Sequence, residues 1–166
     1  GTPSGLINML TALEITLYNG KDPVTGNPMG LETGEFCSFE SFDELWDAYS
    51  KQVEYYVEAL ADQEELEYNI AGENAAFIYL SMLFDDCIER GRAIFSGGIK
   101  YLGGTLETYG NTNTADSLAA IKELVYDKKC ITPEKMLEIL GANFKGYEGE
   151  QQMMLGVPKY GNDDQK

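Results

Sequence analysis

Ala115-Asp116-Ser117-Leu118-Ala119-Ala120-Ile121-Lys122-Glu123-Leu124-Val125-Tyr126 is the stretch of this sequence that says most about its fold. Its apolar residues recur at spacings of three and four, which places them on one face of a helix. The pattern predicts a helix over residues 116–127. The inward face of that helix carries Leu118, Ile121, Leu124 and Val125.

Two more helices are predicted on the carboxyl-terminal side of this stretch. Thr132 suits an N-cap and Pro133 suits the first helical position, so a helix is expected to begin there. Its apolar stripe includes Met136, Leu140 and Phe144. A short helix is expected near residues 148–155.

On the amino-terminal side, residues 99–113 have no helical period. The first of them are typical of a strand, and the rest are glycines, hydroxyls and amides. Such a composition suits backbone that passes close to a ligand or to another segment. Before it, residues 74–92 are apolar on nearly all sides, which predicts a helix covered by its neighbours.

The first third of the chain predicts a helix, a loop and a long helix. Residues 5–18 carry an apolar stripe that ends at Asn19-Gly20, a pair that tolerates the left-handed backbone of a helix end. Residues 21–39 contain three glycines and two prolines and are predicted to be a loop. Ser41 and Glu44 form a capping-box pattern for the long helix, whose acidic residues 62–67 are expected to face solvent. The two stripes consist of Leu6, Met9, Leu10, Leu13 and Leu17, then of Phe42, Leu45, Trp46, Tyr49, Val53, Tyr56, Val57 and Leu60.

Composition excludes several classes of protein. The 166 residues are 43% hydrophobic, so the chain has the material for a core. A formal net charge of −16 repels phosphate backbones and anionic membranes, so neither nucleic acid nor a membrane is an expected partner. No transmembrane run or signal peptide is visible, and a cytoplasmic location is predicted.

The sequence offers few of the residues that hydrolases and metalloproteins use. There is no histidine, which removes serine-type triads and histidine–metal sites. The cysteines are Cys37, Cys87 and Cys130, and none of them forms a C-x-x-C pair. No metal site is therefore predicted, and the roles of the three cysteines stay open.

Four stretches, in this order, resemble the glycyl radical enzymes of the pyruvate formate-lyase superfamily. They cover nearly the whole chain, so one part of a barrel domain over residues 1–166 is expected. The first comprises Ile7-Asn8, Leu13-Glu14 and Asn19-Gly20-Lys21-Asp22-Pro23. The second is Thr33-Gly34-Glu35 with Phe39-Glu40-Ser41-Phe42, and the third is Ser96-Gly97-Gly98 and Tyr101 with Ala115 to Tyr126. The fourth is Asn143-Phe144-Lys145-Gly146-Tyr147-Glu148 with Pro158-Lys159-Tyr160-Gly161-Asn162-Asp163-Asp164.

The resemblance implies an α/β fold, of which this chain is a mostly helical fragment of a ten-stranded barrel. It also implies a chemistry in which a backbone glycyl radical converts a cysteine into a thiyl that abstracts hydrogen from a small organic substrate. A separate S-adenosylmethionine-dependent iron–sulfur activase installs the radical, and the chain itself is expected to bind no cofactor. The full-length enzyme is expected to be a homodimer of anaerobic metabolism.

The two reactive residues of such enzymes have no counterpart here. The context of the thiyl cysteine matches none of the three cysteines, and the radical-glycine loop is missing. The resemblance places the cysteine before Gly1 and the glycine after Lys166, so this segment alone is expected to be inactive. The missing initial methionine fits that expectation, although processing or tag removal would also explain it.

Substrate-binding residues are expected from family position. Tyr101, Thr105, Glu107, Tyr109 and Asn111 would place hydroxyl, carboxylate and amide groups near substrate; a turn that satisfies its own polar groups is the structural alternative. Thr2 would lie at the rim of the thiyl pocket, or be only a frayed terminus.

Three functions stay open on the sequence. Ala115 to Tyr126 resembles the dehydratase, decarboxylase and amine-lyase branches more than it resembles formate acetyltransferase, which is the second candidate. The run Gly97-Gly98-Ile99-Lys100-Tyr101-Leu102-Gly103-Gly104 departs from the pattern of those branches, so no substrate is assigned. The third candidate is an acidic helical binding or scaffold domain, which would unfold cooperatively as a monomer, whereas a barrel fragment would aggregate through exposed apolar surface.

Overall fold

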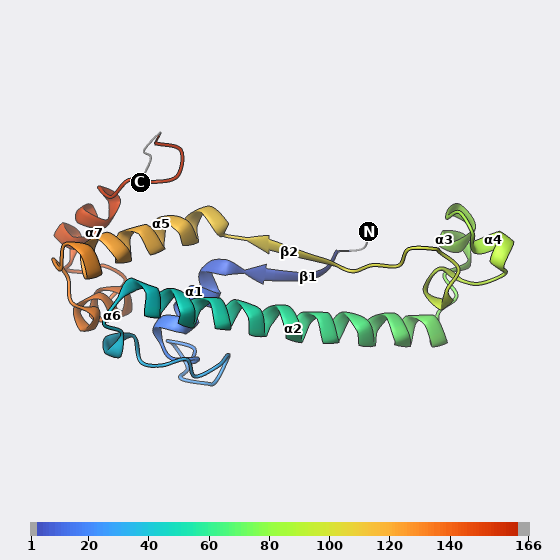
Figure 1. Ribbon diagram of the computed structural model, residues 1–166, viewed down its shortest axis with the longest axis horizontal. Helices are drawn as coiled ribbons and strands as arrows, with labels where there is room; N and C mark the ends of the chain where they lie inside the picture. Colours follow the sequence, from blue (N-terminus) through green and yellow to red (C-terminus); the bar gives the residue numbers. More distant parts are fainter. Residues whose placement is uncertain (1–2, 163–166) are drawn as a thin grey trace. The chain divides into compact units, whose positions relative to one another are not determined.

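The structure is a computed structural model that describes residues 3–162, and its α-helices and strands are labelled in Figure 1. The chain divides into two compact units. Unit 1 contains the residues up to Ile7 and Val57–Glu107, and unit 2 contains Asn8–Tyr56 and the residues from Thr108 onward. Along the chain, the elements are β1 (Pro3–Asn8), α1 (Met9–Leu17), η1 (Phe36–Ser38), α2 (Phe42–Asn74), α3 (Ile78–Leu83), α4 (Cys87–Arg90), η2 (Ile94–Ser96), β2 (Thr105–Tyr109), α5 (Asn111–Ile121), η3 (Lys122–Asp127), α6 (Pro133–Gly141) and α7 (Glu148–Leu155).

The first helix begins later than its sequence pattern predicts. The expected helix over residues 5–18 is in fact β1 followed by α1, and β1 pairs with β2 in a two-stranded sheet. Leu6 is 61% exposed while Ile7 is 4% exposed, which is the alternation of a strand. The Asn8 side-chain oxygen accepts hydrogen bonds from the amides of Leu10 and Thr11 at 3.1 and 3.3 Å. This N-cap fixes where the helix begins.

The end of α1 confirms the prediction. Asn19 and Gly20 have φ values of +50° and +81°, both in the left-handed region. A side chain at Gly20 would also collide with backbone, because a Cβ there would lie 2.4 Å from the Leu31 carbonyl oxygen. Glycine is therefore required at this position both by the backbone angle and by the space available.

Residues 21–39 form the predicted loop, which belongs to unit 2 and is fixed at several points by neighbouring side chains of that unit. Gln52 Oε1 accepts from the Leu31 amide at 3.1 Å, and the Tyr56 hydroxyl donates to the Met29 carbonyl at 2.8 Å. Asn19 Oδ1 accepts from the Gly34 amide at 3.0 Å. These side chains, two from α2 and one from the residue after the C-cap of α1, anchor a segment that has little regular structure of its own.

The long helix α2 begins as predicted. Ser41 Oγ accepts from the Glu44 amide at 3.3 Å, and the Glu44 carboxylate accepts from the Glu40 amide at 2.9 Å, one residue before the position that a capping box uses. Leu45 and Tyr49 of the predicted stripe are buried, whereas Trp46 and Val57 are exposed. The acidic end does not wholly face solvent, because the Glu64 side chain is buried.

The predicted helix over residues 74–92 is wrong. The segment breaks into α3 and α4, because Phe77 and Asp86 adopt φ values of +44° and +73°. Its apolar residues are not covered either. Those exposed are Phe77, Ile78, Tyr79, Met82, Leu83, Phe84 and Ile88, while Cys87 is buried.

The carboxyl-terminal helices agree with the prediction and complete the core of unit 2. The four predicted inward residues of α5 and η3 are buried, Thr132 caps α6 through the Lys135 amide at 3.2 Å, and α7 spans the expected residues. The core cluster joins these helices to α1 and to the first turns of α2. Its buried members are Ala12, Leu13, Leu17, Phe36, Leu45, Tyr49, Leu118, Ala120, Ile121, Leu124, Val125, Ile131, Met136, Ile139 and Val157.

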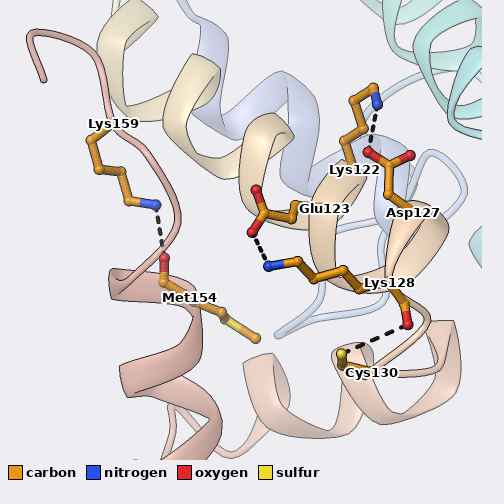
Figure 2. Close-up of polar contacts among 7 residues, drawn as sticks. All are labelled: Lys122, Glu123, Asp127, Lys128, Cys130, Met154 and Lys159. Atoms are coloured by element: carbon orange, nitrogen blue, oxygen red, sulfur yellow. Dashed lines mark hydrogen bonds and ion pairs between the residues drawn. The ribbon is translucent and has the colours of Figure 1, made fainter. Parts of the chain in front are cut away.

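The last part of the predicted helix over 116–127 widens into the π-helix η3. The Lys128 amide donates to the Glu123 carbonyl at 2.8 Å, a five-residue step. Two ion pairs have the same spacing, Lys122–Asp127 at 2.7 Å and Glu123–Lys128 at 2.6 Å (Figure 2). Side chains five residues apart therefore meet along this turn, as they would not in an α-helix.

Candidate functional site

Strand β2 carries Thr105 and Glu107, two of the predicted substrate-binding residues. Side chains alternate along a strand, so these two lie on the same face, and both are exposed. Leu106 points the other way and packs toward Gly5 of β1, where a Cβ would lie 2.9 Å from Leu106 Cδ2. One side of β2 is thus packed within unit 1, and the opposite side offers a hydroxyl and a carboxylate.

The segment before β2 does not have the predicted conformation. The strand lies at residues 105–109 rather than at the start of the 99–113 stretch. Tyr101 precedes the strand and is 82% exposed, with the Lys100 ammonium 5.4 Å from its ring centroid. Tyr101 therefore lies outside the regular structure that holds Thr105 and Glu107.

Tyr109 and Asn111 belong to unit 2 and lie at the junction of β2 and α5. Tyr109 is exposed, and Asn111 is the first residue of α5. The Asn111 side-chain amide donates to Thr108 Oγ1 at 3.0 Å, a local bond at the start of the helix. Gly110 between them has φ +76°, which lets the chain turn from strand to helix. Thr2 lies outside the described residues.

Unit 2 contains a hollow that the sequence did not predict. It has a volume of about 680 Å³ and is lined mainly by apolar side chains of α1, α5, α6 and α7. Two of its polar groups are already bonded to the carboxyl-terminal segment: Lys159 Nζ donates to the Met154 carbonyl at 2.7 Å, and Asp116 Oδ1 accepts from the Tyr160 amide at 2.8 Å. Figure 2 shows the first of these bonds. The only feature of the sequence that could have indicated this hollow was the apolar stripe of α1, because Leu10 of that stripe remains exposed.

The surroundings of Cys37 disfavour a thiolate. Burial, followed by the charges of Glu134 and Glu35, raises the pKa of the Cys37 thiol, so it stays protonated at neutral pH. Cys87 is buried, and the Cys130 thiol donates to the Lys128 carbonyl at 3.7 Å (Figure 2). All three are free of disulfides.

Within residues 3–162, no cluster of three or more metal-ligating side chains is present. Over the same range, no helix has both the length and the apolar character needed to cross a bilayer.

Comparisons with known proteins agree over the whole chain. The family model described as pyruvate formate lyase-like matches residues 1–166. The chain is 37% identical to trans-4-hydroxy-L-proline dehydratase of Clostridioides difficile, over 97% of this chain and 20% of that protein. It is 38% identical to isethionate sulfite-lyase of Oleidesulfovibrio alaskensis, over 96% of this chain and 20% of that protein. The chain therefore spans about a fifth of the length of the curated relatives it matches.

Solved structures show the same similarity in three dimensions. Hydroxyproline dehydratase from Clostridioides difficile, with trans-4-hydroxy-L-proline bound, matches with a TM-score of 0.90 and 37% identity, over 96% of this chain and 20% of the other. The B12-independent glycerol dehydratase from Clostridium butyricum, in a glycerol-bound form, matches with a TM-score of 0.89 and 32% identity, again over 96% and 20%. The mostly helical α/β architecture predicted from the sequence is thereby confirmed as part of such a fold.

Proposed function

We propose, from the premise that this chain belongs to the pyruvate formate lyase-like family, that it is part of an anaerobic glycyl radical lyase of the dehydratase-like branch. The observation that carries the proposal is the similarity to a hydroxyproline dehydratase and a glycerol dehydratase over 96% of the chain. An isethionate sulfite-lyase and a sulfopropanediol dehydratase also match. These relatives favour this branch over formate acetyltransferase, and the family match argues against a free-standing scaffold domain.

The proposed reaction proceeds through hydrogen-atom transfers. A glycyl radical takes a hydrogen atom from a cysteine thiol, which leaves a glycine and a thiyl radical. The thiyl then takes a hydrogen atom from a substrate C–H bond, which restores the thiol and leaves a substrate radical. That radical loses its leaving group together with a proton and becomes a product radical. The product radical takes a hydrogen atom back from the cysteine thiol, which gives the product and regenerates the thiyl, and the thiyl regains the glycyl hydrogen atom to restore the glycyl radical. In this proposal the cysteine and glycine come from outside residues 1–166, and a radical S-adenosylmethionine activase creates the glycyl radical. The segment alone has no activity, and the complete enzyme is a cytoplasmic homodimer.

The substrate is proposed to contact the exposed face of β2. Thr105 and Glu107 present a hydroxyl and a carboxylate from one side of the strand, which suits hydrogen bonds to the hydroxyl or amine groups of a small substrate. Tyr101, Tyr109, Asn111 and Thr2 are proposed as further contacts on the strength of the family resemblance. A strand packed on its other face is a firm support for such groups.

The test is an anaerobic assay of the complete, activated protein. The substrates are trans-4-hydroxy-L-proline, isethionate, glycerol, choline, 4-hydroxyphenylacetate and pyruvate with coenzyme A. We expect turnover of one of the first five and none of pyruvate. Turnover of pyruvate alone would overturn the assignment to the dehydratase-like branch, and turnover of none would overturn the proposed function.

The proposed role of Glu107 in substrate binding can be tested with a variant and a matched control. Replacing a carboxylate that binds substrate by an amide, Glu107→Gln, should raise KM by about tenfold, equivalent to about 1.4 kcal/mol of binding. The control is Glu58→Gln, an exposed glutamate on α2, which should leave KM unchanged. Equal KM values for the two variants would remove Glu107 from the substrate site.

A further inference from the structure

Three side chains on one side of α2 in unit 1 contact β1 and the segment that leads into β2. Leu60, Glu64 and Tyr68 are spaced by four residues, so they share one side of the helix. Leu60 lies against β1, where a Cβ at Gly5 would be 3.3 Å from Leu60 Cδ1. The Tyr68 hydroxyl donates to the Gly103 carbonyl at 3.4 Å. Glu64 lies between these two contacts along the helix.

The side chain of Glu64 occupies the space next to Gly104. A Cβ at Gly104 would lie 1.6 Å from Glu64 Oε2 and 1.9 Å from Glu64 Cδ, whereas a Cβ at Gly103 would meet nothing within 4 Å. Neither glycine has a positive φ, so the backbone angle does not require glycine at either position. An alanine at position 104 would therefore displace the carboxylate of Glu64 from the place it occupies.

The burial of Glu64 runs against its charge. The residue is 9% exposed, and its Oε1 atom is buried without a hydrogen-bond partner among the described residues. Burying a polar atom without a hydrogen-bond partner costs stability. A buried polar atom without a partner does not stabilise the fold. Its side chain is therefore better explained by a role in holding a neighbouring segment in place.

We propose that Glu64 is a positioning residue, which fills the space beside Gly104 and thereby fixes the backbone path on which β2 presents Thr105 and Glu107. The inference rests on the proposed function, since those two side chains are the proposed substrate contacts. The shape of Glu64 performs this role. No hydrogen bond of Oε1 contributes to it, since that buried atom bonds to no group among residues 3–162.

The first test is hydrogen–deuterium exchange of the β2 amides in the complete protein. Gly104→Ala forces Glu64 out of its place and should speed exchange in β2 by about tenfold, a shift equivalent to about 1.4 kcal/mol of local opening. Gly103→Ala is the matched control and should leave exchange unchanged. Glu64→Ala should also speed exchange in β2, because it empties the space beside Gly104, whereas Glu64→Gln keeps the shape of the side chain and should keep the wild-type rate. Equal exchange in the two single glycine variants would overturn the proposal.

The second test separates positioning from general stability. Gly104→Ala and Glu64→Ala should each raise KM by about tenfold, with kcat within about twofold of the wild type. Glu64→Gln keeps the shape of the side chain and should keep the wild-type KM, as should the control Glu65→Ala on the exposed side of the helix. Thermal unfolding of each variant verifies that it is folded.

The outcomes of the two tests distinguish this proposal from the proposed function. If the wild type turns over none of the substrates, the proposed function fails, and the exchange comparison still decides whether Glu64 positions β2. If a substrate is turned over but KM is the same in all variants, the role of Glu64 in substrate binding is overturned while the lyase assignment stands.

Discussion

The hydroxyl of Tyr126 is buried, and it has no hydrogen-bond partner among residues 3–162. Burial, with smaller contributions from Glu44 and Cys37, raises the pKa of Tyr126 to about 12 from 10.0. The folded state therefore favours the neutral phenol, and its contribution to stability is present below pH 10 and lost as pH rises toward about 12.

Tyr126→Phe should therefore reduce the alkaline loss of stability. At about pH 7 the variant should be as stable as the wild type or slightly more so, because it removes a buried hydroxyl without a partner. Urea unfolding between about pH 7 and pH 11 measures the effect. The exposed Tyr79→Phe serves as control, and an identical alkaline slope in all three proteins would contradict the prediction.

Gly30 gives a second prediction at the residue scale. A Cβ at this position would lie 1.9 Å from Nε2 of the fully buried Gln52, whose Oε1 holds the Leu31 amide. Gly30→Ala should therefore destabilise the chain by about 1–3 kcal/mol. Gly149→Ala in α7 is the control, because a Cβ there meets nothing within 4 Å, and it should stabilise by about 0.5–1 kcal/mol. Urea unfolding that finds no difference between the two would refute the steric argument.

At the scale of an element, η3 is a π-helix, and its side-chain ion pairs have the same five-residue spacing as its backbone hydrogen bonds. Lys122–Asp127 and Glu123–Lys128 are both five residues apart and lie on the surface. A double-mutant cycle of Lys122→Ala and Asp127→Ala should give a coupling energy of about 0.2–1 kcal/mol. The coupling should vanish in about 1 M salt and persist in Lys122→Arg. A coupling that salt leaves unchanged would show that the pair does not act through charge.

Helices with caps and a clear apolar period were predictable from the sequence, and the elements that depend on distant partners were not. Thr132 and the inward face of α5 are local signals, so those helices were predicted correctly. β1 has helix-like spacing, yet it pairs with β2, which lies about a hundred residues further along the chain. The predicted helix over residues 74–92 is interrupted by positive φ values at Phe77, before α3, and at Asp86, before α4. Aspartate tolerates such an angle but phenylalanine rarely adopts it, so no signal in the sequence indicated the first of these breaks.

The candidate site was also predictable only in part, because some of its residues depend on segments that are distant in sequence. The family resemblance pointed to Thr105 and Glu107 as substrate contacts, and that role stays a prediction; the structure shows that both are exposed on one face of β2. Glu64 was missed because it belongs to an acidic run, which ordinarily faces solvent. Only the approach of Gly104 to α2 shows that its side chain is enclosed.

At the scale of the whole molecule, the two units differ in how much apolar surface they bury. Every buried member of the hydrophobic core cluster belongs to unit 2. In unit 1 the described buried apolar residues are Ile7, Cys87 and Ile94, while most apolar side chains of α3 are exposed. In the isolated 166-residue chain, amides of residues 57–107 should therefore exchange with deuterium before those of α1, α5 and α6. Uniform exchange across both units would contradict this expectation.

The loop over residues 21–39 has a consequence for engineering. Its anchors, at Met29, Leu31 and Gly34, all follow the turn formed by Asp22 to Asn27. At the tip, Val24 is almost wholly exposed, and a Cβ at Gly26 would touch nothing. An epitope tag or a small reporter domain inserted between Val24 and Gly26 would thus lengthen a surface turn without disturbing the anchors, and it would give the protein an internal handle for purification and imaging.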